Sequence, residues 1–190
     1  MPISEKHSGE GDDKPNTEGR TVSHSAVTMS EVILPHQSGP YQPGRVGYCH
    51  GGEIMKLMDT AAGVVAVRHA HTTVVTARVE GMDFYRPIRV GNYVTVHAFL
   101  TFVGRSTMEV RVDVITEDVI KEKTWHALTA YFIMVALDEE GKPTRVPPLL
   151  ISSEKERELW EKGQRRYQTC KGELMAGDDD YRSCREEPLP

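Results

Sequence analysis

One segment with helical periodicity stands in a chain whose other hydrophobic patterns are those of β-strands. Residues 51–68 read GGEIMKLMDTAAGVVAVR, and their apolar positions cover most of a helical circumference. A helix that is apolar on most sides belongs in the interior of a protein. We therefore expect a largely buried helix with strands wrapped around it.

The strands follow from alternation and composition. Residues 106–114 alternate between apolar and charged side chains, which indicates a strand with one solvated face. Residues 124–137 are apolar on both sides, so we expect a central strand there. The stretches 72–84 and 93–103 are rich in Val, Thr and aromatic residues, and an earlier strand is expected over 22–34. Short connections predict a five-stranded antiparallel meander.

These elements predict an α+β architecture, with one long central helix wrapped by a five-stranded antiparallel sheet. A single sheet around a single helix leaves an edge strand and an apolar rim exposed. A second copy would cover both, so we expect a homodimer with a continuous sheet.

The composition shifts sharply toward both ends of the chain. Both ends are polar or acidic with little apolar content, which predicts disorder. A charged helix with a Ser-x-x-Glu-like start follows the strands, and its Leu159 and Trp160 could pack on the outside of the domain. We expect four parts: an N-terminal tail (1–20), one folded domain (21–150), a C-terminal helix (151–172) and an acidic tail (173–190).

Charge and cysteine content exclude several classes of protein. The 190 residues include 23 Lys and Arg against 28 Asp and Glu, a net charge of −5, which argues against nucleic-acid binding. No apolar run approaches the roughly 20 residues of a membrane-spanning helix, and the first residues do not resemble a signal peptide. Three cysteines without a CxxC motif predict neither a disulfide framework nor a zinc ribbon. We expect a cytoplasmic protein that binds neither nucleic acid nor membranes.

Asp59 is an isolated carboxylate within the apolar helix. Leu57, Met58, Ala61 and Ala62 surround it in the sequence. A carboxylate in such surroundings loses hydration and its pKa rises unless a partner compensates, which would suit a general base or a nucleophile. The alternative is that Asp59 faces solvent or caps a neighbouring loop.

The same helix begins at a His-Gly-Gly sequence. Glycines at 51 and 52 would let a substrate approach the backbone amides closely, and the amino end of a helix favours developing negative charge. The alternative is a plain glycine turn. Gly51, Gly52 and Asp59 lie about two helical turns apart and could flank one electrophilic carbonyl.

Other candidates have weaker support. Cys49 beside His50 could form a nucleophile and its base, but adjacent side chains rarely face each other, and a small buried thiol is the simpler interpretation. Arg105 could bind a phosphate or belong to a tight turn, and Arg86 and Arg89 could be solvated loop charges or share the phosphate role. The eight histidines are scattered without HExxH or a cysteine cluster, so we expect no metal.

Several longer strings carry a resemblance to a known family. They are GGEIMKLMDTAAGVVAVRHA, VVTARVEGMDFYRPIRVGN, VGRSTMEV and FIMVALDEEGKPTRVP. In this order they resemble the hotdog-fold acyl-CoA thioesterases, specifically the cytosolic acyl-CoA hydrolases and their short single-hotdog bacterial relatives. The resemblance covers residues 22–148.

The resemblance implies a site at a dimer interface and an assembly into trimers of dimers. It implies that Asp59 is the catalytic carboxylate and that the amide of Gly51 or Gly52 polarises the thioester. Coenzyme A is then part of the substrate, and no separate cofactor is expected. The expected substrate contacts are His50, Thr76, Met82, Phe84, Gly104, Arg105 and Ser106.

One position departs from the family pattern. The family carries an Asn three residues before the glycine that opens the loop to the helix, and this sequence has Gly44 there, with Gln42 nearby. That Asn is thought to orient the water or the carbonyl from the neighbouring subunit. Either Gln42 or a bound water substitutes for it, or catalysis is impaired.

The sequence leaves three functions to compare. The first is hydrolysis of acyl-CoA, as in fatty acid metabolism, to free acid and coenzyme A. The alternative is a non-catalytic acyl-CoA-binding or sensing protein on the same fold; a DNA-binding version would need a helix-turn-helix, and none is visible. A hotdog dehydratase would use a His with a carboxylate on the helix, and the segment 51–68 contains no His.

Overall fold

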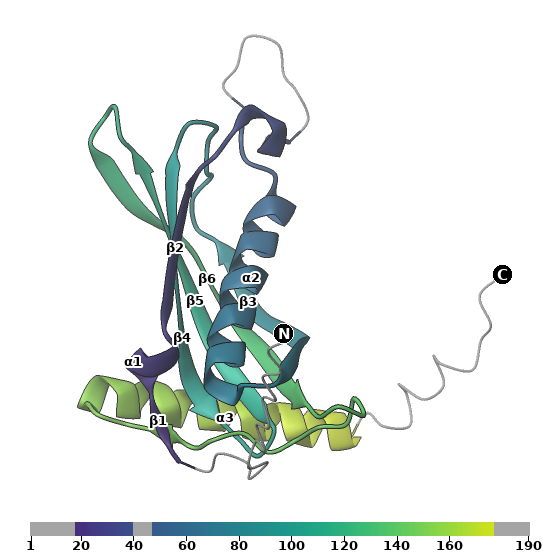
Figure 1. Cartoon of the computed structure of the whole chain (residues 1–190). Helices are drawn as coiled ribbons and strands as arrows, with labels where there is room; N and C mark the ends of the chain where they lie inside the picture. The colour runs from purple at the N-terminus through teal and green to yellow at the C-terminus, as the bar shows by residue number, and fades with distance from the viewer. Residues whose placement is uncertain (1–17, 40–46, 177–190) are drawn as a thin grey trace, which may run out of the picture.

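A long helix lies against a curved antiparallel sheet, and a second helix crosses the sheet at one end (Figure 1). The computed structural model describes residues 18–39 and 47–176. The elements in chain order are β1 (Arg20–Thr21), α1 (Val22–Ser25), β2 (Val27–Val32), η1 (Pro35–Gln37), α2 (Gly51–Ala70), β3 (Thr73–Phe84), β4 (Tyr93–Val103), β5 (Thr107–Asp118), β6 (Lys123–Leu137), β7 (Leu149–Leu150) and α3 (Glu154–Ala176).

The main sheet has the strand order β2-β4-β5-β6-β3, with all neighbours antiparallel. The α+β architecture with five antiparallel strands is therefore confirmed, but the simple meander is wrong for the two outer strands. Only β4, β5 and β6 follow one another as neighbours. The helix α2 stands between β2 and β3 in the chain and carries it across the sheet from one edge to the other.

The helix α2 is amphipathic, not buried on most sides as the sequence predicted. Its buried residues recur at three- and four-residue spacing and face the sheet: Ile54, Met58, Ala61, Ala62, Val65, Ala66 and His69. The small alanines let the helix approach the sheet closely. The opposite face is also partly apolar, yet Met55, Val64 and Val67 are 36–46% exposed. The apolar content of this second face explains the wrong prediction.

The expected first strand over residues 22–34 is interrupted. Val22–Ser25 forms the short helix α1, which buries Val22 and Ser25, and the strand β2 follows it. Arg20, which we placed in the N-terminal tail, pairs with Leu149 in a small parallel sheet. Its guanidinium donates hydrogen bonds to the carbonyls of Arg68 and His69, which lie in the last turn of α2. A cation thus satisfies carbonyls that a helix end leaves without partners.

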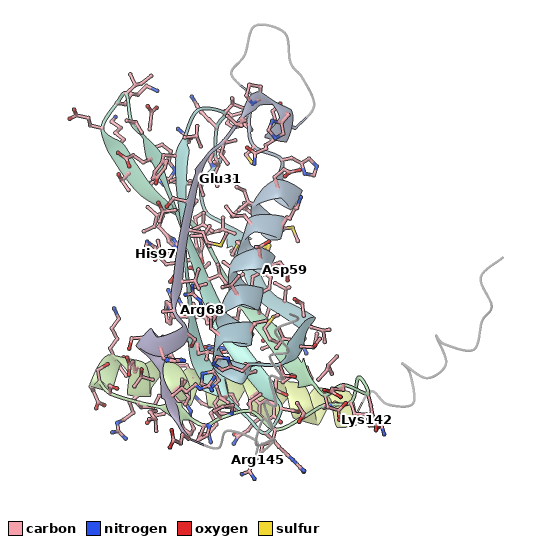
Figure 2. The ribbon with its side chains drawn as sticks, viewed as in Figure 1. Glu31, Asp59, Arg68, His97, Lys142 and Arg145 are labelled. Atoms are coloured by element: carbon pink, nitrogen blue, oxygen red, sulfur yellow. The ribbon has the colours of Figure 1, made fainter. Side chains whose placement is uncertain are left out.

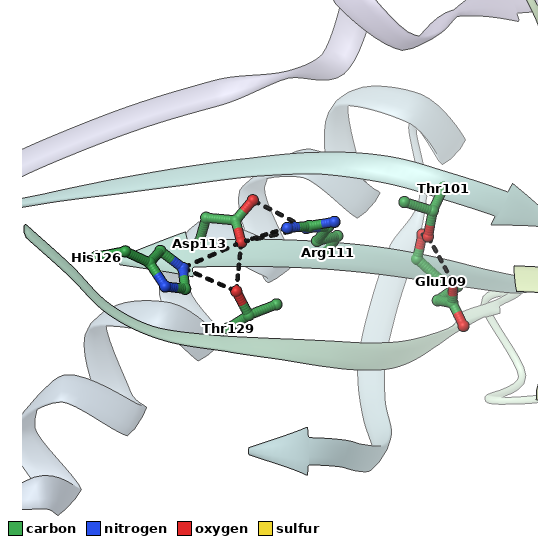
Figure 3. Close-up of polar contacts among 6 residues, drawn as sticks. All are labelled: Thr101, Glu109, Arg111, Asp113, His126 and Thr129. Carbon is green, nitrogen blue, oxygen red and sulfur yellow. Dashed lines mark hydrogen bonds and ion pairs between the residues drawn. The ribbon is translucent and has the colours of Figure 1, made fainter. Parts of the chain in front are cut away.

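The helix α3 packs on the sheet face opposite α2, and a partly buried ion pair holds it there. Arg166 donates to both carboxylate oxygens of Glu109 on β5, at 2.9 and 2.6 Å, and Glu109 is 2% exposed. Thr101 on β4 donates to the same carboxylate at 2.5 Å (Figure 3). Gly163 lies where α3 approaches the sheet most closely. A Cβ there would stand 2.7 Å from both Glu109 Oε1 and Phe102 Cβ.

Two predictions for α3 are confirmed at its start and along its length. The Glu156 backbone amide donates to the Ser153 hydroxyl, and the Glu156 carboxylate accepts from the Ser152 amide, as in a capping box. The Trp160 ring packs against Phe102, with ring centroids 5.5 Å apart, and Leu159 is half-buried. The helix extends to Ala176, beyond the expected end at residue 172.

The outer face of the sheet beside α3 is polar. Asp113 accepts hydrogen bonds from the Arg111 guanidinium at 2.9 Å and from the Thr129 hydroxyl at 2.5 Å, and His126 lies against the same group (Figure 3). These residues come from β5 and β6, whose alternate residues face α2. The alternation thus separates a polar outer face from the apolar core.

The strand β3 is an exposed edge of the sheet. It pairs with β6 on one side, and in the described chain nothing pairs with its other side. Most of its residues are exposed, including Val75 and Val79, and its register shifts twice, once around Gly81 at a φ of 59°. The long exposed edge that the sequence predicted is therefore present at β3.

Gly163→Ala should destabilise the chain, because the new methyl group has no room beside Glu109 and Phe102. Crowding of this kind costs about 1–3 kcal/mol, and the better helix propensity of Ala offsets up to about 1 kcal/mol of it. We expect a lower midpoint in urea unfolding followed by circular dichroism. Lys162→Ala, at the exposed neighbouring position, is the control and should change the midpoint little. Equal or higher stability of Gly163→Ala would contradict the close packing of α3.

Candidate active site

Asp59 and Thr76 form a hydrogen-bonded pair between α2 and β3. The Thr76 hydroxyl donates to Asp59 Oδ1 at 2.6 Å, and Met134 Sδ lies 3.5 Å from the same hydroxyl (Figure 2 labels Asp59). A hydroxyl has one proton, and a carboxylate oxygen is a far better acceptor than a thioether sulfur. Thr76 therefore orients the Asp59 carboxylate and leaves its second oxygen available.

The Asp59 side chain is exposed in the single chain, so the predicted dry surroundings are wrong at this level of assembly. The alternative considered from the sequence, an Asp59 that faces outward, is what the structure shows. The cause is the amphipathic character of α2. Met55, Asp59, Gly63 and Val67 follow one another at four-residue spacing and form a row outside the buried stripe of α2, with Asp59 on the flank beside the edge strand β3.

Of the two glycine amides in the first turn of α2, one forms a hydrogen bond within the chain. His50 is the N-cap residue, and its Nδ1 accepts a hydrogen bond from the Gly52 amide at 3.1 Å. The amide of Glu53 donates to the His50 carbonyl. Among the described residues, none accepts a hydrogen bond from the Gly51 amide. Of the two amides that the sequence analysis considered, Gly51 is therefore the one available for a substrate oxygen.

A small apolar cavity lies at this end of α2. Its volume is about 200 Å³. The residues that line it are Tyr48, Cys49, Gly51, Ile54, Phe84, Pro87 and Ile88. The Phe84 ring comes within 3.6 Å of the position that a Cβ of Gly51 would occupy. Phe84 and Gly51, two predicted site residues, thus meet at one cavity.

The remaining predicted contacts lie elsewhere. Gly104, Arg105 and Ser106 form the turn between β4 and β5, at the end of the sheet far from the start of α2 (Figure 1). The Arg105 and Ser106 carbonyls accept from Val146 and Ala136 amides, respectively. Within one chain, this turn and the Gly51 cavity do not form a common site.

Two further positions from the sequence analysis are Met82, a predicted substrate contact, and Gly44, the departure from the family pattern. Met82 is half-buried and packs against the core on β3. Gly44 and Gln42, the positions of the departure from the family pattern, lie outside the described residues.

Cys49 does not have the properties of a nucleophile. Burial raises the pKa of its thiol from 9.0 to about 11, and the nearby carboxylates of Glu53 and Glu31 add to the increase. The Cys49 thiol lies 3.6 Å from the His50 carbonyl, and the His50 ring is engaged with Gly52. The thiol is protonated at neutral pH, which agrees with the simpler interpretation of the Cys49-His50 sequence.

The described residues, 18–39 and 47–176, contain no group of three or more His, Cys, Asp or Glu side chains that could hold a metal ion. No helix in that part of the chain is long and apolar enough to cross a bilayer.

The pairing of Asp59 with Thr76 was not predicted from the sequence, although a simple count could have found it. Asp59 lies 12 helical residues before the left-handed C-cap His71, or about 18 Å along the helix. Thr76 lies five residues after it, or about 17 Å along an extended strand. Since the chain reverses its direction at His71, Asp59 and Thr76 come to the same height along the helix axis.

Comparison with known proteins agrees with this geometry. A family model described as the thioesterase superfamily matches residues 46–123. The cytosolic acyl coenzyme A thioester hydrolase of Rattus norvegicus is 39% identical over 154 residues, which are 80% of this chain and 39% of that protein. The acyl-CoA thioester hydrolase YciA of Salmonella typhimurium is 35% identical over 122 residues, 63% of this chain and 92% of that protein. This chain thus spans about two fifths of the rat relative.

Solved structures show the same fold. An asparagine-to-alanine mutant of a Staphylococcus aureus acyl-CoA hydrolase, in complex with coenzyme A, matches with a TM-score of 0.79 and 26% identity, over 90% of this chain and 100% of that one. Mutants of that enzyme with an aspartate or a threonine changed to alanine match with TM-scores of 0.77 and 0.74. An apo-hexameric acyl-CoA thioesterase matches with a TM-score of 0.74 and 29% identity, over 83% of this chain and 97% of that one.

The chain therefore belongs to the thioesterase superfamily and has its hotdog fold, which confirms the resemblance seen in the sequence. A relative that it covers almost completely, YciA, is an acyl-CoA thioester hydrolase.

Alkylation of Cys49 should reveal its raised pKa. In a Cys170→Ser, Cys184→Ser variant, Cys49 is the remaining cysteine. Because the thiolate reacts and its pKa is about 11, the rate with iodoacetamide should rise roughly 100-fold between pH 8 and pH 10. A thiol with the ordinary pKa would give a rise of roughly tenfold over that range, and such a result would contradict the burial described here.

Proposed function

We propose that this protein hydrolyses acyl-CoA thioesters to a free carboxylic acid and coenzyme A, with Asp59 as the catalytic carboxylate. The observation that carries the proposal is the hydrogen bond from Thr76, which presents the Asp59 carboxylate on the outward face of α2. The activity named for the relatives, and the coenzyme A bound to the S. aureus protein, support the substrate class.

The positions altered in the S. aureus enzyme support the choice of residues. Its mutated aspartate and threonine are 17 residues apart, which is also the separation of Asp59 and Thr76. Its mutated asparagine precedes the aspartate by 15 residues, which corresponds to Gly44 in this chain. The exchange at Gly44 favours the second candidate, a protein that binds acyl-CoA without hydrolysing it, and an activity assay separates the two.

Each active site requires two chains. Gly51 and Asp59 are eight residues apart on one helix, or about 12 Å along its axis. A reacting carbonyl needs its oxygen within about 3 Å of the amide and its carbon close to the carboxylate or to a water bound by it. One chain cannot place both groups there. We therefore propose that Gly51 of one protomer and Asp59 of its partner act on the same thioester.

The proposed reaction follows from these two groups. The Gly51 amide and the positive end of α2 hold the thioester oxygen and stabilise the oxyanion as it forms. Asp59 either takes a proton from a water whose oxygen attacks the carbonyl carbon, or attacks that carbon itself to form an anhydride that water then cleaves. In both routes the C–S bond breaks and coenzyme A leaves as the thiol. Heavy oxygen in Asp59 after a single turnover in labelled water identifies the second route, because only there can water attack the aspartyl carbonyl of the anhydride.

The surface of the single chain supports a dimer. The open edge of β3 and the exposed apolar residues of α2 lie side by side, because β3 follows α2 directly and packs against it. Pairing of β3 with β3 of a second copy would satisfy the edge and cover the outward face of α2, which carries Asp59. The hexamers named for two solved relatives support a trimer of dimers. The name "cytosolic" of the mammalian relatives supports a cytoplasmic location.

Asp59→Asn should lower the rate of coenzyme A release by at least about 10²-fold, because an amide can neither accept the proton nor attack the carbonyl. Binding of coenzyme A should persist. A thiol-release assay with acyl-CoAs of several chain lengths provides the measurement. Asp83→Asn, an exposed change of the same kind on β3, is the control and should keep the wild-type rate. Near-normal turnover of Asp59→Asn would refute the assignment, and an inactive wild type would favour the binding protein.

Val79→Asp should separate the protomers and, because each proposed site needs two chains, should abolish hydrolysis as well. Val79 pairs with Phe132 on the face of the sheet that α2 covers, and it is 38% exposed at the open edge. A carboxylate there would be desolvated on association without a partner. Sedimentation should show smaller particles, and circular dichroism should show that the variant keeps the native spectrum. Ile120→Asp, on the 95% exposed tip of the β5–β6 hairpin, is the control. A Val79→Asp protein with unchanged size would contradict β3 as the contact.

A further inference from the structure

A second cavity, of about 310 Å³, lies beside the apolar one and is lined mainly by cationic side chains. The loop after β3 supplies one wall, and the end of β5, the following hairpin and the start of β6 supply the other. The residues that line it are Arg86, Pro87, Arg89, Asp118, Lys121, Lys123 and Trp125. Four cations therefore gather around one cavity in a chain of net charge −5.

One of the four charges is already neutralised. Lys121 Nζ lies 2.7 Å from Asp118 Oδ2, and this hydrogen bond lowers the pKa of Asp118, so the pair is ionised. Arg86 and Lys123 form no ion pair with any described residue, and Arg89 lies over the ring of Tyr48, with its guanidinium carbon 5.5 Å from the ring centre. Three uncompensated cations thus remain at the cavity.

One residue that lines the cavity has a polar group enclosed by the protein. The indole Nε1 of Trp125 is buried and has no hydrogen-bond partner in the described structure. The indole, guanidinium and ammonium groups are all donors and none can accept. A ligand that fits this cavity must therefore be rich in acceptors and negatively charged.

We propose that this cavity binds the phosphate groups of a nucleotide. Guanidinium groups match phosphate oxygens in geometry, and several cations around one volume suit a ligand with more than one phosphate. The ligand is either the nucleotide end of the coenzyme A substrate or a free nucleotide. The first case rests on the function proposed above, and the second does not.

The position of the cavity fits either source. Pro87 lines both this cavity and the apolar one at the start of α2. Arg89 of the basic cavity contacts Tyr48 of the apolar one. A coenzyme A held here would have its pantetheine arm directed toward Gly51. The turn formed by Gly104–Ser106, which the family resemblance assigns to coenzyme A, lies at the other end of the same chain.

The fluorescence of Trp125 tests the proposal directly. Trp160→Phe leaves Trp125 as the single tryptophan of the chain. Titration of this variant with coenzyme A, adenosine 3′,5′-bisphosphate, ATP and pyrophosphate should give a saturable change with at least one probe, and added salt should weaken it. Binding of coenzyme A and adenosine 3′,5′-bisphosphate assigns the site to the substrate, whereas binding of ATP or pyrophosphate without competition by coenzyme A assigns it to a free ligand.

Charge reversal supplies the matched comparison. Arg86→Glu and Lys123→Glu in the Trp160→Phe background should each weaken binding at least tenfold, whereas Lys155→Glu on the exposed side of α3 should not. Circular dichroism verifies that each variant is folded. No saturable change with any probe up to millimolar concentration, or a change that survives both reversals, would overturn the proposal.

A second assay separates this inference from the proposed activity. If the substrate is the ligand, Arg86→Glu should raise KM for acyl-CoA without altering hydrolysis of an acyl-N-acetylcysteamine, which lacks the nucleotide. Asp59→Asn should retain the fluorescence titration. If the protein with wild-type Asp59 hydrolyses acyl-CoA but gives no fluorescence titration, the phosphate site alone is refuted. If it gives the titration but does not hydrolyse acyl-CoA, the activity alone is refuted.

Discussion

The packing of α2 on the sheet determines the position of every group in the candidate site. Alanines at 61, 62 and 66, together with Ile54 and Met58, place the helix close against the strands. This contact turns the row from Met55 to Val67 outward, and Asp59 with it. It also brings β3 back along the helix, so that Thr76 meets the carboxylate. The hydrogen bond between them thus depends on the apolar contact of the adjacent helix face with the sheet.

The sequence predicted local elements well and their partners poorly. The strand over residues 93–103 and the start of α2 at Gly51 were predicted at the observed positions, because alternation and the glycine pair are local signals. The placement of β2 and β3 at opposite edges depends on contacts distant in the sequence. The apolar neighbours Leu57, Met58, Ala61 and Ala62 led to the expectation of dry surroundings for Asp59, since hydrophobicity in the sequence does not distinguish a core face from an exposed apolar face.

The structure brings the predicted site residues together in two pairs and leaves the predicted coenzyme A turn apart from both. Asp59 contacts Thr76, and Gly51 meets Phe84 at the apolar cavity. The turn at Gly104–Ser106 lies at the far end of the sheet. The sequence offered Arg86 and Arg89 as candidates for a phosphate role, but not the whole basic cavity, because Lys123 comes from a segment that only the folded sheet places beside them. Their arrangement depends on the pairing of β6 with both β3 and β5.

The second edge of the sheet limits how large an assembly built by strand pairing can become. When two copies join through β3, the strand at each outer end is β2, which has six residues and includes Glu31. A short edge with a charged side chain is a poor template for further pairing. In the dimer proposed above, the two edges of one sheet have opposite roles: the long one would pair with the partner, and the short one would end the sheet at two chains. Growth beyond that proposed pair would use faces, not edges.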